Sequence, residues 1–213
     1  MILLTGFEPF GGESLNPSWL AVQRAAEILR REGHTVATVE LPCVFGDSAK
    51  VLGEALREHG PAIVLSVGMA GGRSRLSLER VAINCDDARI PDNRGQRPID
   101  EAVVAGGPAA YFSTLPIKAA LRNLQIEGIR AEVSQTAGTY VCNHVFYALM
   151  HALASKEGVR GGFVHVPYLP EQLPVDSSLP SMPLESIAQG IAVVIRTSIQ
   201  TMVDDKFAAG AVH

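Results

Sequence analysis

Cys142 is the residue at which this sequence first suggests chemistry. It follows a predicted β-strand at residues 131–136 and a turn of small residues, and it begins a helical pattern that continues to residue 156. A thiol at the start of a helix lies near the positive end of the helix dipole and near unpaired backbone N–H groups, which favour the thiolate. A buried structural thiol is the commoner role of a cysteine, but this position makes a nucleophile an equally good interpretation.

A nucleophilic thiol needs a nearby imidazole to exchange protons with it, and position excludes most of the six histidines. His144 follows Cys142 by two residues, about 200° around the helix, and His151 lies roughly 13 Å further along it. His165 ends a predicted strand, residues 162–166, at the sheet edge where Cys142 should lie. His165 is therefore the candidate base, and the alternative is a core histidine whose hydrogen bonds are satisfied. The other three stand at a strand start, a helix end and the chain terminus: His34, His59 and His213.

An acidic side chain bonded to the imidazole would orient the ring. Six candidates lie in or beside an irregular region at residues 68–100: Glu79, Asp86, Asp87, Asp92, Asp100 and Glu101. Glu79 differs from the others because the alternating apolar segment around it, residues 77–84, predicts a strand that would tether the carboxylate. The pattern does not choose among the six. For Glu79 the alternative is a surface ion pair with Arg73 or Arg80.

Alternating strand and helix patterns must bring these side chains together. Short apolar runs at residues 2–6 and 62–67 predict strands buried on both faces, and apolar residues at helical spacing predict the helices between strands. This order is typical of a single-domain three-layer α/β/α sandwich with an open, mostly parallel, twisted sheet. Ligands bind such sheets beyond the carboxyl ends of the strands, so we expect the loops after residues 6, 67, 136 and 166 to meet there.

Composition argues against several classes of partner and cofactor. The 213 residues carry 18 basic and 22 acidic side chains, and the basic ones are scattered, so we expect neither nucleic acid nor an anionic membrane as a partner. Apolar runs are too short for a signal peptide or a membrane-spanning helix, which predicts a cytoplasmic protein. Three cysteines without CxxC spacing argue against disulfides and zinc, and Cys43 and Cys85 read as structural. We expect no cofactor, and one domain over residues 1–213 because no linker divides the chain.

Two glycine-containing loops could contribute to a ligand site. Phe7 and Phe10 flank the loop after the first strand, where they would either cover the core or form the wall of an apolar pocket. The segment Gly71-Gly72-Arg73 could instead hold a phosphate, although it matches neither of the two glycine-rich phosphate motifs. The alternative function is therefore a phosphate- or nucleoside-binding α/β protein in which Cys142 is only structural.

Seven segments together resemble pyroglutamyl peptidase type I, also called pyrrolidone carboxyl peptidase. They occur in order along the chain: Thr5–Gly12, Asn16–Trp19, Gly68–Arg73, Glu79–Asn84, Asp87–Asn93, Ser134–His144 and Val164–Pro167. That family consists of cysteine peptidases that remove an N-terminal pyroglutamyl residue from peptides. The resemblance implies an α/β/α sandwich, small peptides with N-terminal pyroglutamate as substrates, and assembly as a homo-oligomer, often a tetramer.

The resemblance also implies roles for individual residues. Cys142 matches the family's nucleophile, His165 its general base and acid, and Glu79 its acidic third member. Arg89 and the backbone N–H of Cys142 correspond to the oxyanion region. The substrate pocket corresponds to Phe7, Phe10, Met69, Ile90, Tyr140 and Val141. Met69 stands where many relatives have Gln. A contact of the Gln side chain with the substrate would therefore be lost, whereas a contact of the main chain would be kept. Tyr140 replaces a frequent Phe and adds a hydroxyl that needs a partner.

Overall fold

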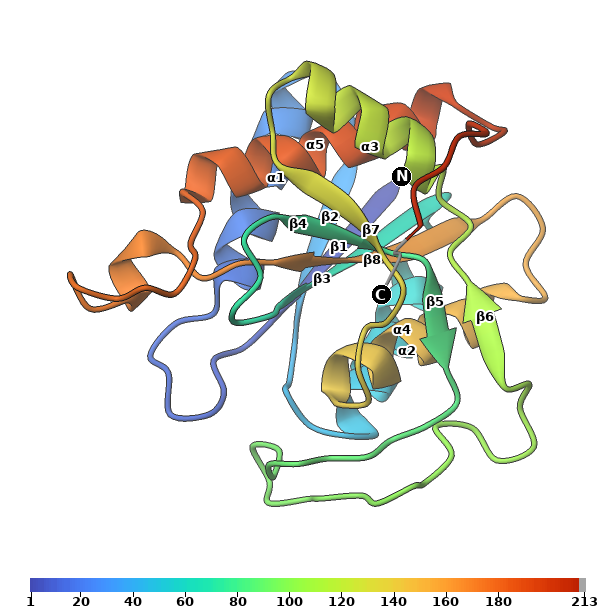
Figure 1. The fold of residues 1–213 in the computed structure, drawn as a ribbon. Helices are drawn as coiled ribbons and strands as arrows, with labels where there is room; N and C mark the ends of the chain where they lie inside the picture. Colours follow the sequence, from blue (N-terminus) through green and yellow to red (C-terminus); the bar gives the residue numbers. More distant parts are fainter. Residues whose placement is uncertain (211–213) are drawn as a thin grey trace.

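A six-stranded sheet forms the middle layer of the molecule, with helices packed on both of its faces (Figure 1). A computed structural model describes residues 1–210, so His213 lies outside the described residues. The predicted three-layer α/β/α sandwich with a mostly parallel sheet is confirmed. One face carries α1 (Pro17–Arg31), α3 (Ile117–Ile126) and α5 (Leu184–Gln200), and the other carries α2 (Asp47–His59) and α4 (Val141–Leu153). The short 3-10 helix η1 (Pro170–Gln172) precedes α5.

The strand order across the sheet is β2-β1-β3-β8-β4-β7. The strands are β1 (Ile2–Phe7), β2 (Val36–Leu41), β3 (Ile63–Met69), β4 (Leu76–Glu79), β7 (Ala131–Ser134) and β8 (Arg160–Val166). Four of them, β1, β2, β3 and β8, run parallel, whereas β4 and β7 run the opposite way. Residues 70–75, which join β3 to β4, are too few for the crossover that a parallel strand requires, so β4 turns back.

This reversal corrects one expectation about the loops. The chain after β7 does not leave the sheet at the carboxyl edge of the parallel strands, because β7 runs with β4 and against β8. Ala137 nevertheless lines the same cavity as Phe7, Met69 and His165. The predicted meeting therefore holds for the segments after residues 6, 67 and 136, although the third arrives from the other direction. By contrast, β8 contributes His165 from within the strand, and among residues 1–210 no residue after Val166 lines the cavity.

The single strand predicted around residues 77–84 is two strands in two different sheets. β4 ends at Glu79, and β5 (Val81–Ile83) pairs instead with β6 (Ala110–Phe112) in a small antiparallel sheet. The strand β6 was not predicted, because its three residues are too short a run to indicate a strand and are half-buried or exposed. The division has a consequence for the site, since Glu79 becomes the last residue of a strand that pairs with β8.

Two apolar cores hold the layers together, one on each face of the sheet. All residues of β1 and β3 are buried, as the continuous apolar runs predicted, so both strands contribute to both cores. On one side the core includes the inner faces of α1 and α5, and on the other it includes much of α4. Burial on this scale anchors the start of α4, where Cys142 lies.

Candidate active site

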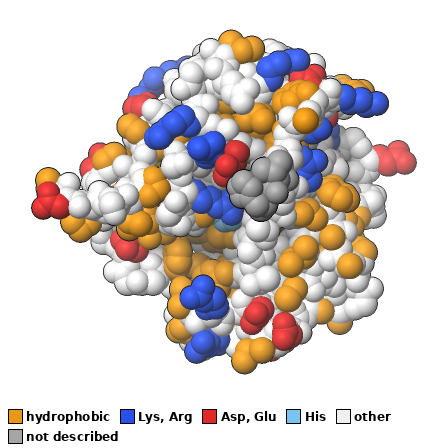
Figure 2. All heavy atoms as spheres, in the orientation of Figure 1, with side chains coloured by type: hydrophobic (Ala, Val, Ile, Leu, Met, Phe, Trp, Pro, Cys, Tyr) orange, Lys and Arg blue, Asp and Glu red, His pale blue; other side chains and the backbone are white. Residues whose placement is uncertain are grey.

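Cys142 and His165 line one cavity of about 180 Å³ beyond the ends of β1, β3 and β8. Phe7, Phe10, Met69 and Tyr140, all predicted pocket residues, line it as well. Figure 2 shows hydrophobic side chains gathered in a hollow on this side of the molecule, below a group of Lys and Arg side chains. The structure therefore brings together residues from the first strand, the third strand, the start of α4 and the end of β8.

Gly68 explains how the thiol can approach the histidine strand. In the parallel pair β3–β8, Gly68 stands directly opposite His165. A β-carbon added to Gly68 would fall 2.7 Å from Cys142 Sγ and 2.8 Å from the ring of Phe163, closer than such contacts occur in proteins. The missing side chain at Gly68 thus leaves the space that the sulfur occupies next to the His165 strand.

Glu79 is the acidic residue that contacts His165. The His165 Nδ1 atom lies 2.7 Å from Glu79 Oε1, and both side chains are buried. The bond follows from the pairing of β4 with β8, in which Ser77 stands opposite His165 and Glu79 opposite Phe163. A carboxylate that accepts the Nδ1 proton leaves Nε2 as the proton acceptor of the ring. Glu79 also forms an ion pair with Arg73, so both contacts that the sequence suggested for it are present.

The other acidic candidates lie elsewhere. Asp86 binds His144, and Asp92 accepts hydrogen bonds from the backbone N–H groups of Phe45 and Arg94. The remaining three, Asp87, Asp100 and Glu101, are exposed. None of these five residues lines the cavity.

Arg73 is committed to Glu79 rather than to a phosphate site. Its Nη1 atom lies 2.7 Å from Glu79 Oε1, and its Nη2 atom donates to the carbonyl of Thr136 at 3.1 Å. A guanidinium held in this way has few donors left for an anion. The alternative function built on Gly71-Gly72-Arg73 therefore loses its cation.

Burial sets the protonation of the two central groups. Desolvation raises the pKa of the Cys142 thiol well above its usual range, and the charges of Cys43 and Glu79 raise it further, against a smaller opposing effect of Arg73. Desolvation also lowers the pKa of His165, which the bond to Glu79 only partly offsets. The expected lowering of the thiol pKa at the helix start is thus wrong, because desolvation, the largest cause, raises the pKa of this thiol. The resting pair is a neutral thiol beside a neutral imidazole.

Aromatic side chains form much of the cavity wall. The Phe10 ring lies 6.1 Å from that of Tyr140, which in turn meets Phe45 edge-on at 5.4 Å. The hydroxyl of Tyr140 donates to the carbonyl of Pro91 at 3.1 Å. This bond supplies the partner that the additional hydroxyl at this position required.

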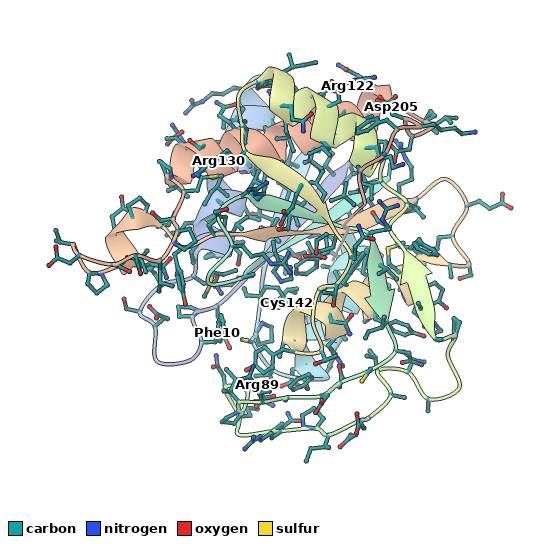
Figure 3. All side chains as sticks on the ribbon, viewed as in Figure 1. Phe10, Arg89, Arg122, Arg130, Cys142 and Asp205 are labelled. Carbon is teal, nitrogen blue, oxygen red and sulfur yellow. The ribbon has the colours of Figure 1, made fainter. Side chains whose placement is uncertain are left out.

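Three predicted site residues do not line the cavity. Val141 is fully buried in the core beneath α4, so its side chain faces away. Arg89 and Ile90 lie on the long loop that follows β5, where both side chains are exposed. Figure 3 shows Arg89 on this loop, below Phe10 and Cys142. Resemblance to the family's motifs assigned these three residues to the pocket. A motif does not fix the direction of a side chain, because that depends on how the loop and the first turn of α4 pack.

Three lining residues were missed from the sequence: Asn16, Cys43 and Ala137. Asn16 caps α1, since its Oδ1 accepts from the backbone N–H of Ser18, and its Nδ2 donates to the carbonyl of Glu8. An Asn before Pro17 is a recognisable helix-start signal, but nothing in that signal says that the residue also faces a cavity. Cys43 read as structural because it carries no helix or motif signal.

The two histidines of α4 that geometry excluded lie away from the cavity. The His144 Nδ1 atom lies 2.7 Å from Asp86 Oδ2, and the backbone N–H of Gly46 donates to His144 Nε2. The His151 Nδ1 atom is 2.9 Å from the hydroxyl of Tyr111. Within residues 1–210, no cluster of three or more His, Cys, Asp or Glu side chains has the geometry to hold a metal ion. No helix in that range has the length and hydropathy to span a membrane.

Comparison with known proteins places this fold and cavity among relatives. The family model described as pyroglutamyl peptidase matches residues 1–201. A pyrrolidone-carboxylate peptidase of Cupriavidus pinatubonensis is 56% identical over 214 residues, covering 100% of this chain and 99% of the relative. A crystal structure of pyroglutamyl peptidase I from Bacillus amyloliquefaciens superposes with a TM-score of 0.91 at 43% identity, covering 97% of this chain and 98% of that one. A variant of the pyrrolidone carboxyl peptidase of Pyrococcus furiosus gives 0.84 at 42% identity, covering 93% and 98%.

Proposed function

This chain belongs to the pyroglutamyl peptidase family, cysteine peptidases that remove an N-terminal pyroglutamyl residue from peptides, and we propose that Cys142, His165 and Glu79 perform this reaction. The observation that supports the assignment is the buried chain of contacts in which Glu79 Oε1 lies 2.7 Å from His165 Nδ1 while His165 and Cys142 line one cavity. The geometry matches the logic of a nucleophile, a base and an orienting acid.

In the first half of the reaction, Cys142 is acylated. Because the thiol and the imidazole are both neutral at rest, His165 Nε2 takes the thiol proton as Sγ attacks the pyroglutamyl carbonyl. The carbon–sulfur bond forms, and the peptide carbon–nitrogen bond then breaks. The imidazolium gives its proton to the departing amine, and Glu79 stabilises the transient positive charge on His165.

In the second half, water releases the product. His165 takes a proton from a water molecule that attacks the thioester, and the carbon–sulfur bond breaks. The proton returns to the sulfur, which restores the neutral thiol and frees pyroglutamate. No cofactor is required for either half of the reaction.

The oxyanion is stabilised by the start of α4. The first N–H groups of a helix have no partner within it, and those of Val141, Cys142 and Asn143 occupy these positions. Each such donor contributes roughly 3 kcal/mol to the transition state. Arg89, which the resemblance also implied, is exposed on the neighbouring loop, so we assign this role to the backbone alone.

The cavity suits a small neutral lactam. Its volume of about 180 Å³ is below the roughly 300–1,000 Å³ typical of sites for larger ligands. The rings of Phe7, Phe10 and Tyr140 supply apolar walls. Asn16 uses one Nδ2 hydrogen on Glu8, and the second is available to donate to a lactam oxygen. The main chain of Met69 is available for a further polar contact, independent of its side chain.

Replacement of the nucleophile tests the proposal directly. We expect Cys142→Ser to abolish release of a chromophore from a pyroglutamyl anilide while the circular dichroism spectrum stays that of the folded protein. His165→Ala should be similarly inactive. Turnover by Cys142→Ser at a substantial fraction of the unmodified rate would overturn the assignment of the nucleophile.

We also propose that the protein is cytoplasmic and assembles as a homotetramer. Large apolar side chains that are exposed in the single chain support the assembly, among them Phe112, Met202 and Val203 at 67%, 75% and 79% exposure. Such side chains are typical of surfaces that a partner covers. Sedimentation equilibrium would give the mass of a tetramer, whereas a monomer at high protein concentration would contradict the proposal. Fractionation of the source cells tests the location.

A further inference from the structure

Arg73 contacts the same carboxylate oxygen as the candidate catalytic histidine. Its Nη1 atom and the Nδ1 atom of His165 each lie 2.7 Å from Glu79 Oε1. Arg73 lies in the loop of residues 70–75 between β3 and β4, so it approaches Glu79 from outside the sheet, whereas His165 approaches from β8. The guanidinium and the imidazole therefore hold one oxygen from two sides.

The same guanidinium also reaches the segment that leads to the nucleophile. Nη1 donates to Ser134 Oγ at 3.3 Å, and Nη2 donates to the carbonyl of Thr136 at 3.1 Å. Residue Ala137, next to Thr136, lines the cavity, and α4 begins four residues later. One side chain thus connects the acidic residue with the approach to the helix of Cys142.

The loop conformation that delivers Arg73 depends on a glycine. A β-carbon on Gly71 would fall 2.5 Å from the hydroxyl oxygen of Tyr168, so that side chain would have to move, and Gly72 has φ +86°, a conformation that residues with side chains rarely adopt. The backbone N–H of Ala70 donates to Val166 at the end of β8, which fixes the base of the loop. The glycines that suggested a phosphate cradle therefore have a different use, which is to place Arg73.

Charge explains why a cation is needed at this position. Glu79 is fully buried, and an unpaired buried carboxylate costs several kcal/mol. Within residues 1–210, only Arg73 and His165 contact its Oε1, and Oε2 has no partner. Because His165 is neutral at rest, Arg73 supplies the positive charge that balances Glu79. Arg73 itself is only 26% exposed, so solvent screens the pair less than it screens a surface ion pair.

We propose that Arg73 is a positioning residue for the reaction, which holds Glu79 in the orientation that fixes His165 and balances the buried charge of Glu79. This inference rests on the proposed roles of Cys142, His165 and Glu79. It assigns Arg73 no contact with the substrate. The effect should therefore appear in kcat and in the pH profile more than in KM.

The charged and titratable groups around His165 give the direction of the pH effect. Glu79 faces the ring from β4, Arg73 from the loop of residues 70–75, and Cys142 from α4, with Cys43 beside Cys142. Arg73 lowers the pKa of both His165 and Cys142. Its removal should raise the pKa of His165 and move the acidic limb of the pH–rate profile to higher pH. A role confined to folding would not move this limb.

The test compares Arg73→Ala and Arg73→Lys with Arg75→Ala, a matched change of a surface arginine in the same loop. Among residues 1–210, the only ion pair of Arg75 is a 3.7 Å contact with Glu132. We expect Arg73→Ala to lose about tenfold to hundredfold in kcat, the equivalent of one charge-assisted hydrogen bond. KM should stay nearly constant. Arg73→Lys should recover part of the rate, and Arg75→Ala should behave as the unmodified enzyme.

Guanidinium at millimolar concentration provides a second measurement, because a small cation can enter the space left by Arg73→Ala. It should restore part of kcat in Arg73→Ala, but not in Glu79→Gln, and should leave the unmodified enzyme unchanged. If Glu79→Gln and Cys142→Ser are impaired while Arg73→Ala keeps its rate and pH profile, the inference about Arg73 is wrong and the proposed function stands. If Glu79→Gln itself keeps full activity, the proposed role of Glu79 fails and that of Arg73 fails with it.

Discussion

The hydroxyl of Tyr140 donates to the carbonyl of Pro91 across 3.1 Å, which joins the residue before α4 to the long loop after β5. The ring of Tyr140 is at the same time part of the cavity wall, between Phe10 and Phe45. A single side chain thus connects the cavity wall with the loop that covers this side of the molecule.

This relationship predicts a small effect for loss of the hydroxyl and a larger one for loss of the ring. We expect Tyr140→Phe to change kcat/KM by less than about threefold, because the exposed Pro91 carbonyl can bond to water instead. Tyr140→Ala removes both aromatic contacts and should raise KM for a pyroglutamyl anilide about tenfold. Equal losses in the two variants would show that the hydroxyl, not the ring, is what the substrate needs.

Gly68 provides a test of the space around the sulfur. A methyl group there would meet Cys142 Sγ and the Phe163 ring, so Gly68→Ala must displace one of them. Misplacing a reacting atom by about 1 Å can cost on the order of a hundredfold in rate. We expect a loss of that size in kcat together with a folded circular dichroism spectrum. Gly53→Ala, in a helix where a β-carbon meets only a flexible arginine end at 3.6 Å, is the control that should keep its activity.

The pKa of His165 predicts the acidic limb of the activity profile. Burial lowers that pKa below its usual 6.5, so the imidazole is a neutral base at neutral pH and becomes protonated only as the pH falls through the lowered value. We expect kcat/KM to remain level down to about pH 6.5 and to fall below it. An acidic limb with its midpoint above pH 6.5 would contradict the neutral resting state of the ring.

The rate of alkylation tests the protonation state of Cys142, the partner of His165. Because burial raises the pKa of the Cys142 thiol, the rate at which iodoacetamide labels it should keep rising beyond the pKa of about 8.5 of an ordinary thiol. Peptide mapping by mass spectrometry separates this labelling from that of Cys43 and Cys85. A rate that is already constant near neutral pH would instead indicate a thiolate in the resting enzyme.

His144 should matter for stability rather than for chemistry. Its bonds to Asp86 and to the backbone of Gly46 are buried, and removal of one partner of a buried pair costs about 3–5 kcal/mol. We expect His144→Ala to lower the denaturation midpoint clearly while kcat of the folded fraction stays within about threefold. His151→Ala, a change at an exposed position of the same helix, should leave both quantities unchanged. A collapse of kcat in folded His144→Ala would mean that the wrong histidine was excluded.

Local patterns in the sequence determined the layers of the fold and the two central residues of the site. Apolar runs and helical spacing are properties of neighbouring residues, and they indicated the strand β1, the strand β3 and the helix that begins beside Cys142. Parallel strands present their carboxyl ends at one edge, and this rule selected His165. The rotation between successive helix residues excluded His144, so both choices were made before any contact was known. The roles of Glu79, Arg89 and the pocket residues came instead from resemblance to a family.

Only the tertiary structure decided which long-range contacts form and how deeply the groups are buried. The pairing of β4 with β8 joined Glu79 to His165, and the alternating pattern that predicted a strand here predicted neither this partner nor the antiparallel direction. Packing turned Asn16 and Cys43 toward the cavity and Val141 away from it. Burial also reversed the expected shift of the Cys142 pKa, because desolvation depends on all the atoms around a group and not on its neighbours in the chain.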